Sequence, residues 1–132
     1  MEPIRRVGII SKPEVKPAER LVPELLAWLD KRNIDYRLDE ATASYAEAPQ
    51  KTVTREHVPD DCQLVIVLGG DGTLLSAARA IAGREIPLFA VNLGGLGFLT
   101  AISTDELYPE LERALRNEHR IAKRRMLTCE VQ

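Results

Sequence analysis

Two glycine-rich stretches, each directly after a run of apolar residues, hold the residues whose types and spacing could do chemistry. The first is Gly69-Gly70-Asp71-Gly72-Thr73, which follows the apolar run LVIVL, and the second is residues 92–100 (NLGGLGFLT). Six of the eight glycines lie in these two stretches. Glycine lets the backbone approach a ligand closely, and the amides that open a following helix bind anions. The pattern therefore predicts a phosphate site that carries one carboxylate.

The familiar nucleotide fingerprints do not fit the first stretch. A dinucleotide fingerprint would need a third glycine at position 75, which is Leu75. A Walker loop would need a Gly-Lys pair, which the chain lacks, and no serine-nucleophile elbow is present. The stretch is therefore a phosphate loop of another kind.

Asp71 has two interpretations. An aspartate at the start of a helix is a good N-cap, and Thr73 could share that role. Alternatively, the carboxylate acts as a general base on an attacking hydroxyl, or helps to hold a magnesium ion that bridges phosphates. Both of the latter roles suit phosphoryl transfer.

The elements that must position these loops alternate along the chain. Short apolar runs predict strands, and apolar residues at helical spacing predict helices. We expect strands at 4–11, 34–38, 64–68, 88–93 and 120–132, helices at 17–32, 73–82 and 104–118, and a mobile or irregular connection at 39–61. This order predicts an α/β fold: a Rossmann-like open parallel sheet with helices on both faces. Ligands of such sheets bind at the carboxyl ends of the strands.

Composition narrows the class of protein. The 132 residues suit one domain, 45% of them are hydrophobic, and the net charge is −2. We therefore expect no nucleic-acid partner and no membrane span. Cys62 and Cys129 lack the spacing of a metal site and are expected to be reduced thiols buried in a cytoplasmic protein. His57, His119 and acids between 39 and 61 such as Glu47 are expected on the surface, although that segment could close over a nucleotide.

Gly69-Gly70-Asp71-Gly72-Thr73 resembles the signature shared by NAD kinases, diacylglycerol and sphingosine kinases and, with Ser for Thr, phosphofructokinases. The second stretch, NLGGLGFLT, resembles the second loop of bacterial NAD kinases, whereas lipid kinases carry Gly-Thr-Gly-Asn-Asp there. The opening VGIISKP and the closing RRMLTCEV are also similar to NAD kinases. The resemblance covers essentially the whole chain.

The resemblance implies transfer of a phosphoryl group from ATP, or from inorganic polyphosphate, to the 2′-hydroxyl of the adenosine ribose of NAD. A divalent metal, usually Mg²⁺, is required in that family. Asp71 matches the proton acceptor. The positions implied to bind nucleotide are Gly69, Gly70, Asp71, Gly72, Thr73, Asn92, Gly97, Phe98 and Leu99. Some relatives carry a ligand-contacting arginine five residues after the aspartate, but this chain has Ser76 there, so that contact is not carried over.

The family resemblance also predicts the domain organisation. Residues 1–119 match the α/β catalytic-loop domain, and residues 120–132 match the start of a C-terminal β-rich domain. We expect such an N-terminal portion to be inactive alone, and the full-length protein to be a homo-oligomer, a dimer or tetramer. Two other functions stay open: another kinase with the same aspartate loop, acting on a lipid or a sugar, and a non-catalytic nucleotide-binding module.

Overall fold

The computed structural model describes residues 3–93, 102–116 and 126–128, and within these ranges the chain forms one five-stranded sheet in the order β2-β1-β3-β4-β5. The strands are β1 (Arg6–Ser11), β2 (Asp35–Leu38), β3 (Leu64–Gly69), β4 (Pro87–Asn92) and β5 (Met126–Thr128). The first four run parallel, and β5 pairs with β4 in the antiparallel direction. The carboxyl ends of β1 to β4 therefore meet at one edge of the sheet.

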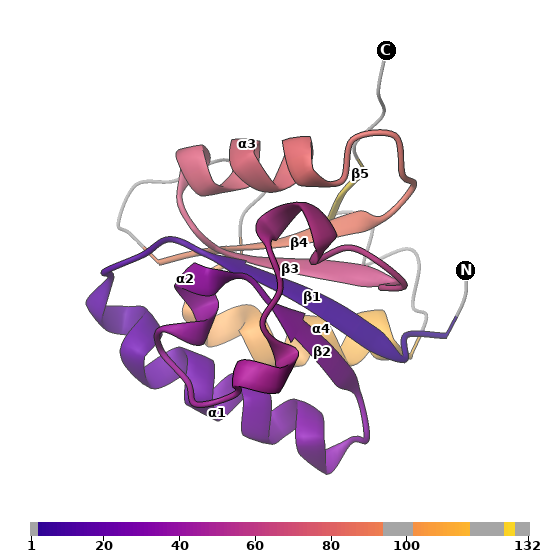
Figure 1. Cartoon of the computed structure of the whole chain (residues 1–132). Helices are drawn as coiled ribbons and strands as arrows, with labels where there is room; N and C mark the ends of the chain where they lie inside the picture. The colour runs from indigo at the N-terminus through magenta and orange to yellow at the C-terminus, as the bar shows by residue number, and fades with distance from the viewer. Residues whose placement is uncertain (1–2, 94–101, 117–125, 129–132) are drawn as a thin grey trace.

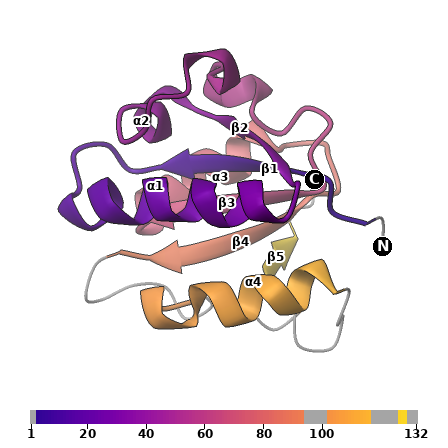
Figure 2. The same ribbon diagram turned by 90° about the horizontal axis from the view of Figure 1, so that it is seen from below.

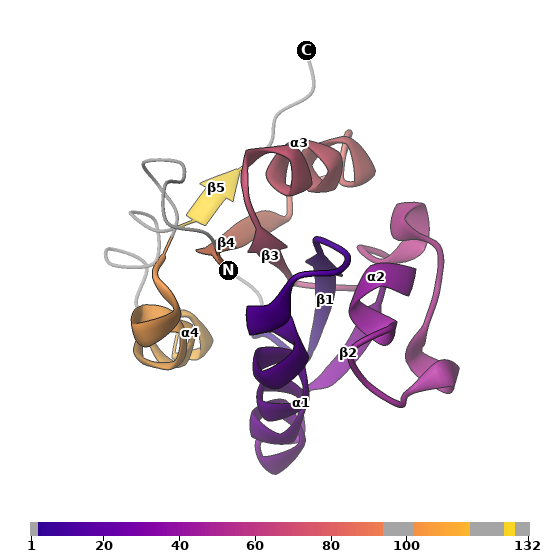
Figure 3. The ribbon, with the colours of Figure 1, turned by 90° about the vertical axis from the view of Figure 1, so that its left-hand side faces the viewer.

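Helices cover both faces of the sheet (Figure 1). They are α1 (Lys16–Lys31), α2 (Glu40–Ala43), α3 (Asp71–Ala80) and α4 (Leu107–Leu115), with short 3-10 helices η1 (Pro49–Lys51), η2 (Arg55–His57) and η3 (Thr104–Glu106). In the edge-on view α3 lies on one side of the sheet, and α1 and α4 lie on the other (Figure 3). No helix among the described residues is long and apolar enough to span a bilayer.

Two apolar layers hold these helices to the sheet. The β3 residues Leu64, Ile66 and Leu68 pack with the α1–α4 layer, whereas Val65 and Val67 pack with the α3 layer. Because successive side chains of a strand point to opposite faces, a strand buried on both faces reads as an unbroken apolar run. Gly69 and the residues after the LVIVL run therefore lie at the carboxyl edge of the sheet.

Helices α1 and α4 lie against the same face and contact each other (Figure 2). The Trp28 and Tyr108 rings are 5.6 Å apart between centroids, and Arg32 Nε lies 3.2 Å from the Glu112 carboxylate. These contacts hold α4 against α1 on this face of the sheet.

The α/β class, the parallel direction of the first four strands and the helices on both faces are confirmed. Three expectations were wrong in detail. The helix expected at 73–82 begins at Asp71, the helix expected at 104–118 is split into η3 and α4, and the last strand is antiparallel. Residues 39–61 are not simply irregular, since they form α2, η1 and η2 and a β-bridge joins Leu38 to Thr52.

Candidate functional site

The two glycine-rich stretches begin side by side at the carboxyl edge of the sheet. Gly69 ends β3 and is paired in register with Asn92, which ends β4. The next residue, Leu93, donates its backbone N–H to the Gly69 carbonyl at 3.1 Å. The topology therefore brings the first loop and the start of the second together, as loops that line the ligand crevice of an open α/β sheet.

The first loop turns directly into α3. Gly70 is the N-cap residue, without any side-chain cap, and its carbonyl accepts the N–H of Leu74 at 3.0 Å. Asp71 is the first residue of the helix, so the interpretation of Asp71 as the cap was wrong. The first N–H groups of a helix have no partner within the helix and face an incoming anion. Asp71 is exposed, and its carboxylate makes no hydrogen bond or ion pair with the described part of the chain.

A hollow of about 300 Å³ lies in front of this turn. It is lined by Ser11, Lys12, Pro13, Arg55, Gly70, Asp71, Gly72 and Thr73. The lining combines the open end of α3, one free carboxylate and two cationic side chains. This arrangement can bind a phosphate group and can accept a proton from a hydroxyl held beside it.

Gly69 is required for the shape of the turn. A Cβ at this position would lie 2.5 Å from Thr73 Oγ1, 2.8 Å from Thr73 Cβ and 3.1 Å from Lys12 Cβ. Thr73 is buried, so it cannot move aside cheaply. The absence of a side chain at Gly69 therefore lets the start of α3 close onto the ends of β3 and β1.

We expect Gly69→Ala to lower the free energy of unfolding by about 1–3 kcal/mol, because the added methyl group overpacks the turn. Gly72→Ala is the matched control, since nothing lies within 4 Å of a Cβ there and Gly72 is not the N-cap residue, where alanine would itself be unfavourable. Urea denaturation of both variants measures the difference. Equal midpoints for the two would contradict the steric account.

Sequence reasoning missed two residues beside this site. Asp39 follows β2 directly, and its side chain is 2% exposed. Arg55, in η2, donates Nε to Asp39 Oδ2 at 2.8 Å and Nη1 to Ser76 Oγ at 2.7 Å. The expectation that the acids of 39–61 lie in a solvated loop was therefore wrong for Asp39, although Glu47 is exposed as expected. His57 is exposed and pairs with Asp60.

One of these residues left a signal in the sequence. Asp39 comes immediately after an alternating strand pattern, which places it at the carboxyl edge with Asp71. The sequence contains no such signal for Arg55, because this residue lies in a segment without helical or strand periodicity. Only the folded chain brings Arg55 to α3. The predicted site residues Gly97, Phe98 and Leu99, together with His119 and Cys129, lie outside the described residues.

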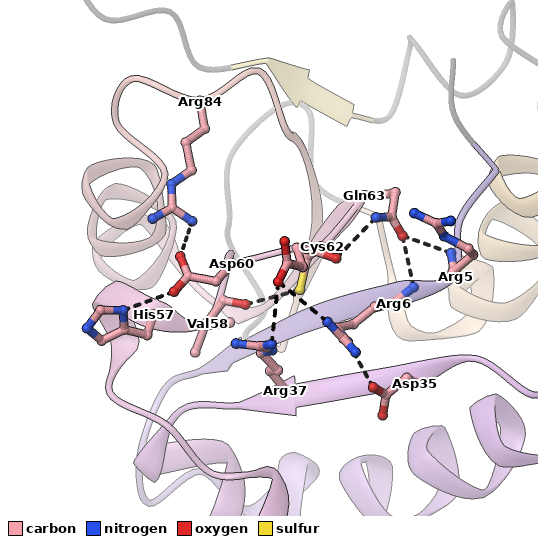
Figure 4. Close-up of polar contacts among 11 residues, drawn as sticks. Arg5, Arg6, Asp35, Arg37, His57, Val58, Asp60, Cys62, Gln63 and Arg84 are labelled. Carbon is pink, nitrogen blue, oxygen red and sulfur yellow. Dashed lines mark hydrogen bonds and ion pairs between the residues drawn. The ribbon is translucent and has the colours of Figure 1, made fainter.

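A larger hollow, of about 580 Å³, lies at the opposite edge of the sheet, where the strands begin. Its polar groups are largely satisfied by one another (Figure 4): the Gln63 side chain accepts the N–H groups of Arg5 and Arg6, and Arg6 Nε donates to Asp35 at 2.8 Å. Cys62 Sγ donates to the Val58 carbonyl, and burial raises the pKa of this thiol to about 12. This edge has neither a glycine loop nor the start of α3, so we do not place the chemistry there.

Asp35 gives this edge a defined pH dependence. Burial alone would raise the pKa of its carboxyl, but hydrogen bonds from Lys51 and Arg6 outweigh burial and hold the pKa at about 2. A carboxyl with a lowered pKa in the folded state stabilises the fold above its unfolded pKa, and this contribution is lost as the pH falls through the folded pKa.

We therefore expect the chain to lose stability between about pH 4 and pH 2, and Asp35→Asn to flatten the profile in that window. Urea midpoints measured from pH 6 to pH 2 test this. Because the Asp35 side chain is 37% exposed, solvent screening keeps the effect small. A parallel loss in wild type and variant would contradict it.

The comparisons with known proteins show the family to which the chain belongs. The family model described as the ATP-NAD kinase N-terminal domain matches residues 7–119. The chain belongs to this family. It is 65% identical over 128 residues to the NAD kinase of Solibacter usitatus and 41% identical over 129 residues to that of Geobacter metallireducens. These alignments cover 97% and 98% of the chain but only 44% and 45% of the relatives.

The fold of this ATP-NAD kinase N-terminal domain is also found in a solved structure. Yeast NADH kinase, crystallised with NADH, superposes with a TM-score of 0.73 over 88% of this chain and 39% of the yeast chain. At 20% identity the likeness concerns the fold alone. The chain thus spans less than half the length of these two NAD kinases.

Proposed function

We propose that this domain supplies the catalytic loop of an NAD kinase, which transfers the terminal phosphoryl group of ATP to the 2′-hydroxyl of the adenosine ribose of NAD and yields NADP. The observation that carries the proposal is the free carboxylate of Asp71, placed at the open end of α3 in a hollow lined by glycine backbone. Membership of the ATP-NAD kinase N-terminal domain family supports it.

In the proposed reaction, the N–H groups that open α3 bind phosphate oxygens and hold the donor in line with the ribose. Asp71 accepts the proton of the 2′-hydroxyl group while the oxygen of that hydroxyl group forms a bond to the terminal phosphorus. The bond from that phosphorus to the bridging oxygen breaks, and ADP leaves with the electron pair. Positioning and electrostatic stabilisation supply most of the catalysis in such transfers.

The residues that line the hollow are compatible with a magnesium ion that binds together with the phosphoryl donor. Among the described residues no group of three or more His, Cys, Asp or Glu side chains is arranged so that it could hold a metal ion on its own. Mg²⁺ commonly binds through one or two carboxylates and substrate phosphates, and Asp71 provides one such carboxylate. When bound, the ion would neutralise charge on the phosphates.

The rest of the proposal concerns parts beyond the described site. We propose that residues 1–119 form the catalytic-loop domain, that residues 120–132 begin a β-rich domain, and that Gly97, Phe98 and Leu99 of the second loop contact the dinucleotide.

We also propose that inorganic polyphosphate is an alternative donor and that the working enzyme is a cytoplasmic dimer or tetramer. Light scattering on the active protein tests the oligomer.

The test of the activity is a chimaera in which this chain replaces the matching 128 residues of the Solibacter usitatus NAD kinase. We expect it to form NADP from NAD and ATP, measured with an NADP-specific dehydrogenase. NADH, diacylglycerol and a sugar serve as competing acceptors. A folded chimaera that phosphorylates only a lipid or sugar, or nothing, would overturn the proposal, provided that the parent enzyme is active. The 132-residue chain alone is expected to form no NADP.

A further inference from the structure

The hollow in front of α3 contains a guanidinium that the glycine-loop motif does not account for. Arg55 comes from η2, in the connection between β2 and β3, and lies more than a dozen residues before the loop in sequence. Its side chain is 33% exposed and lines the same hollow as Asp71 and Thr73. The fold therefore brings a fixed positive charge from a separate segment to the phosphate loop.

Three elements fix this guanidinium. Nε and Nη2 donate to one carboxylate oxygen of the buried Asp39, at 2.8 and 2.5 Å. Nη2 also donates to the Ser11 carbonyl at 3.1 Å, and Nη1 donates to Ser76 Oγ at 2.7 Å. The anchors thus lie at the end of β1, just beyond β2, and on α3. An arginine held in this way loses little conformational freedom when it binds a ligand.

The hydrogen bonding leaves Arg55 able to take a ligand. A guanidinium carries five N–H donors, and four hydrogen bonds to the described residues are formed, so one N–H of Nη1 remains. Asp39 is buried, with a side chain only 2% exposed, whereas Arg55 lines the hollow in front of α3 and also a second hollow, of about 370 Å³, which Asp39 lines too. Arg55 thus borders the hollow that contains Asp71 and retains one N–H donor.

The charge of the hollow also favours an anion. Lys12 lines the hollow too, and its side chain makes no hydrogen bond or ion pair with the described part of the chain. Lys12 offsets the repulsion that Asp71 would exert on an incoming phosphate, whereas the charge of Arg55 is already paired with Asp39, so that Arg55 adds a directed N–H donor. The open end of α3 adds a further partial positive charge.

We propose that Arg55, held by Asp39 and Ser76 and assisted by Lys12, binds the phosphate chain of the phosphoryl donor beside Asp71. This inference rests on the proposed kinase function, because it assigns the donor to that same site. The shared chemistry is a linear chain of phosphates, which ATP and inorganic polyphosphate both present. Arg55 would contact the donor, and Asp39 and Ser76 would be positioning residues.

The kinetic test uses the chimaera and its Arg55→Gln variant. We expect the KM for ATP and for polyphosphate to rise at least 10-fold, and the KM for NAD to change less than 2-fold. Arg84→Gln is the matched control, since it removes the same charge by the same substitution from a partly exposed ion pair with Asp60. Unchanged donor KM values, or a rise for NAD alone, would overturn the inference. An equal rise for both donors assigns Arg55 to the phosphate chain, and a rise for ATP alone would contradict that assignment.

A second measurement separates phosphate binding by Arg55 from the contribution of Arg55 to the stability of the fold. The pair Asp39→Asn with Arg55→Gln removes both charges together, so no charge is left buried without a partner. We expect this pair to unfold closer to the wild-type midpoint than Asp39→Asn alone, yet to bind inorganic tripolyphosphate at least 10-fold more weakly. Wild-type affinity in the double variant would overturn the inference. Calorimetry on the 132-residue chain gives this result even if the unmodified chimaera makes no NADP, which would be the separate failure of the kinase proposal.

Discussion

Asp71→Asn is expected to lower the kcat for NADP formation in the chimaera by about 10²–10⁴-fold, because the amide cannot take a proton from the ribose hydroxyl. The fold should tolerate the change. Asp71 is exposed and forms no cap, so only its favourable interaction with the start of α3 is lost, about 0.3–1 kcal/mol. The expected result is therefore an inactive variant that unfolds at nearly the wild-type midpoint.

The matched control is Asp105→Asn, which makes the same chemical change at an exposed acid in the first turn of η3. Its kcat should stay within 2-fold of the parent, a limit set roughly by what surface substitutions change. A titration with Mg²⁺ separates the two roles open to Asp71: restoration of activity at high Mg²⁺ would indicate a metal ligand rather than a base. An Asp71→Asn variant that keeps more than a tenth of the parental kcat would contradict both roles.

The strands and their buried faces were predictable because a strand that is buried on both faces consists of an unbroken run of apolar residues. The run LVIVL reads as a strand covered on both sides, and both of its faces are indeed buried. The boundaries of α3 were less predictable. The sequence made Asp71 an attractive cap, but Gly70 takes the extended N-cap conformation and Asp71 becomes the first helical residue. Cap geometry depends on how the turn meets the neighbouring strands, which local sequence does not contain.

The glycine loop could be recognised from sequence alone, whereas the presence of Arg55 beside it could not. Gly69 and Asn92 lie together because parallel strands end at one edge, a consequence of topology that the order of elements already implies. Arg55 reaches the same place through long-range contacts with Asp39 and Ser76, at separations of 16 and 21 residues. Contacts of this kind have no periodicity, so they appear only when the whole chain is folded.

Asp39→Ala is expected to lower the free energy of unfolding by about 3 kcal/mol, the lower end of the range for removing one partner of a buried ion pair, since Arg55 is partly exposed. Two further hydrogen bonds would be lost with the carboxylate. Asp39 Oδ1 accepts the backbone N–H of Thr42 at 2.9 Å, which caps α2, and Thr42 Oγ1 at 2.6 Å. Thr42 is itself fully buried, so its polar groups would lose a partner that water cannot replace.

Glu40→Ala is the matched control for this variant, because Glu40 is the next acid along the chain, exposed in the first turn of α2. Its loss should cost less than about 1 kcal/mol. Asp39→Asn should fall between the two, since its amide oxygen can still cap α2 but its NH₂ group would face the donors of Arg55. Urea denaturation of the three variants measures this order. A loss below 1 kcal/mol for Asp39→Ala would mean that the Asp39–Arg55 pair contributes little to the fold, and Arg55 would then need another anchor to hold its place at the phosphate loop.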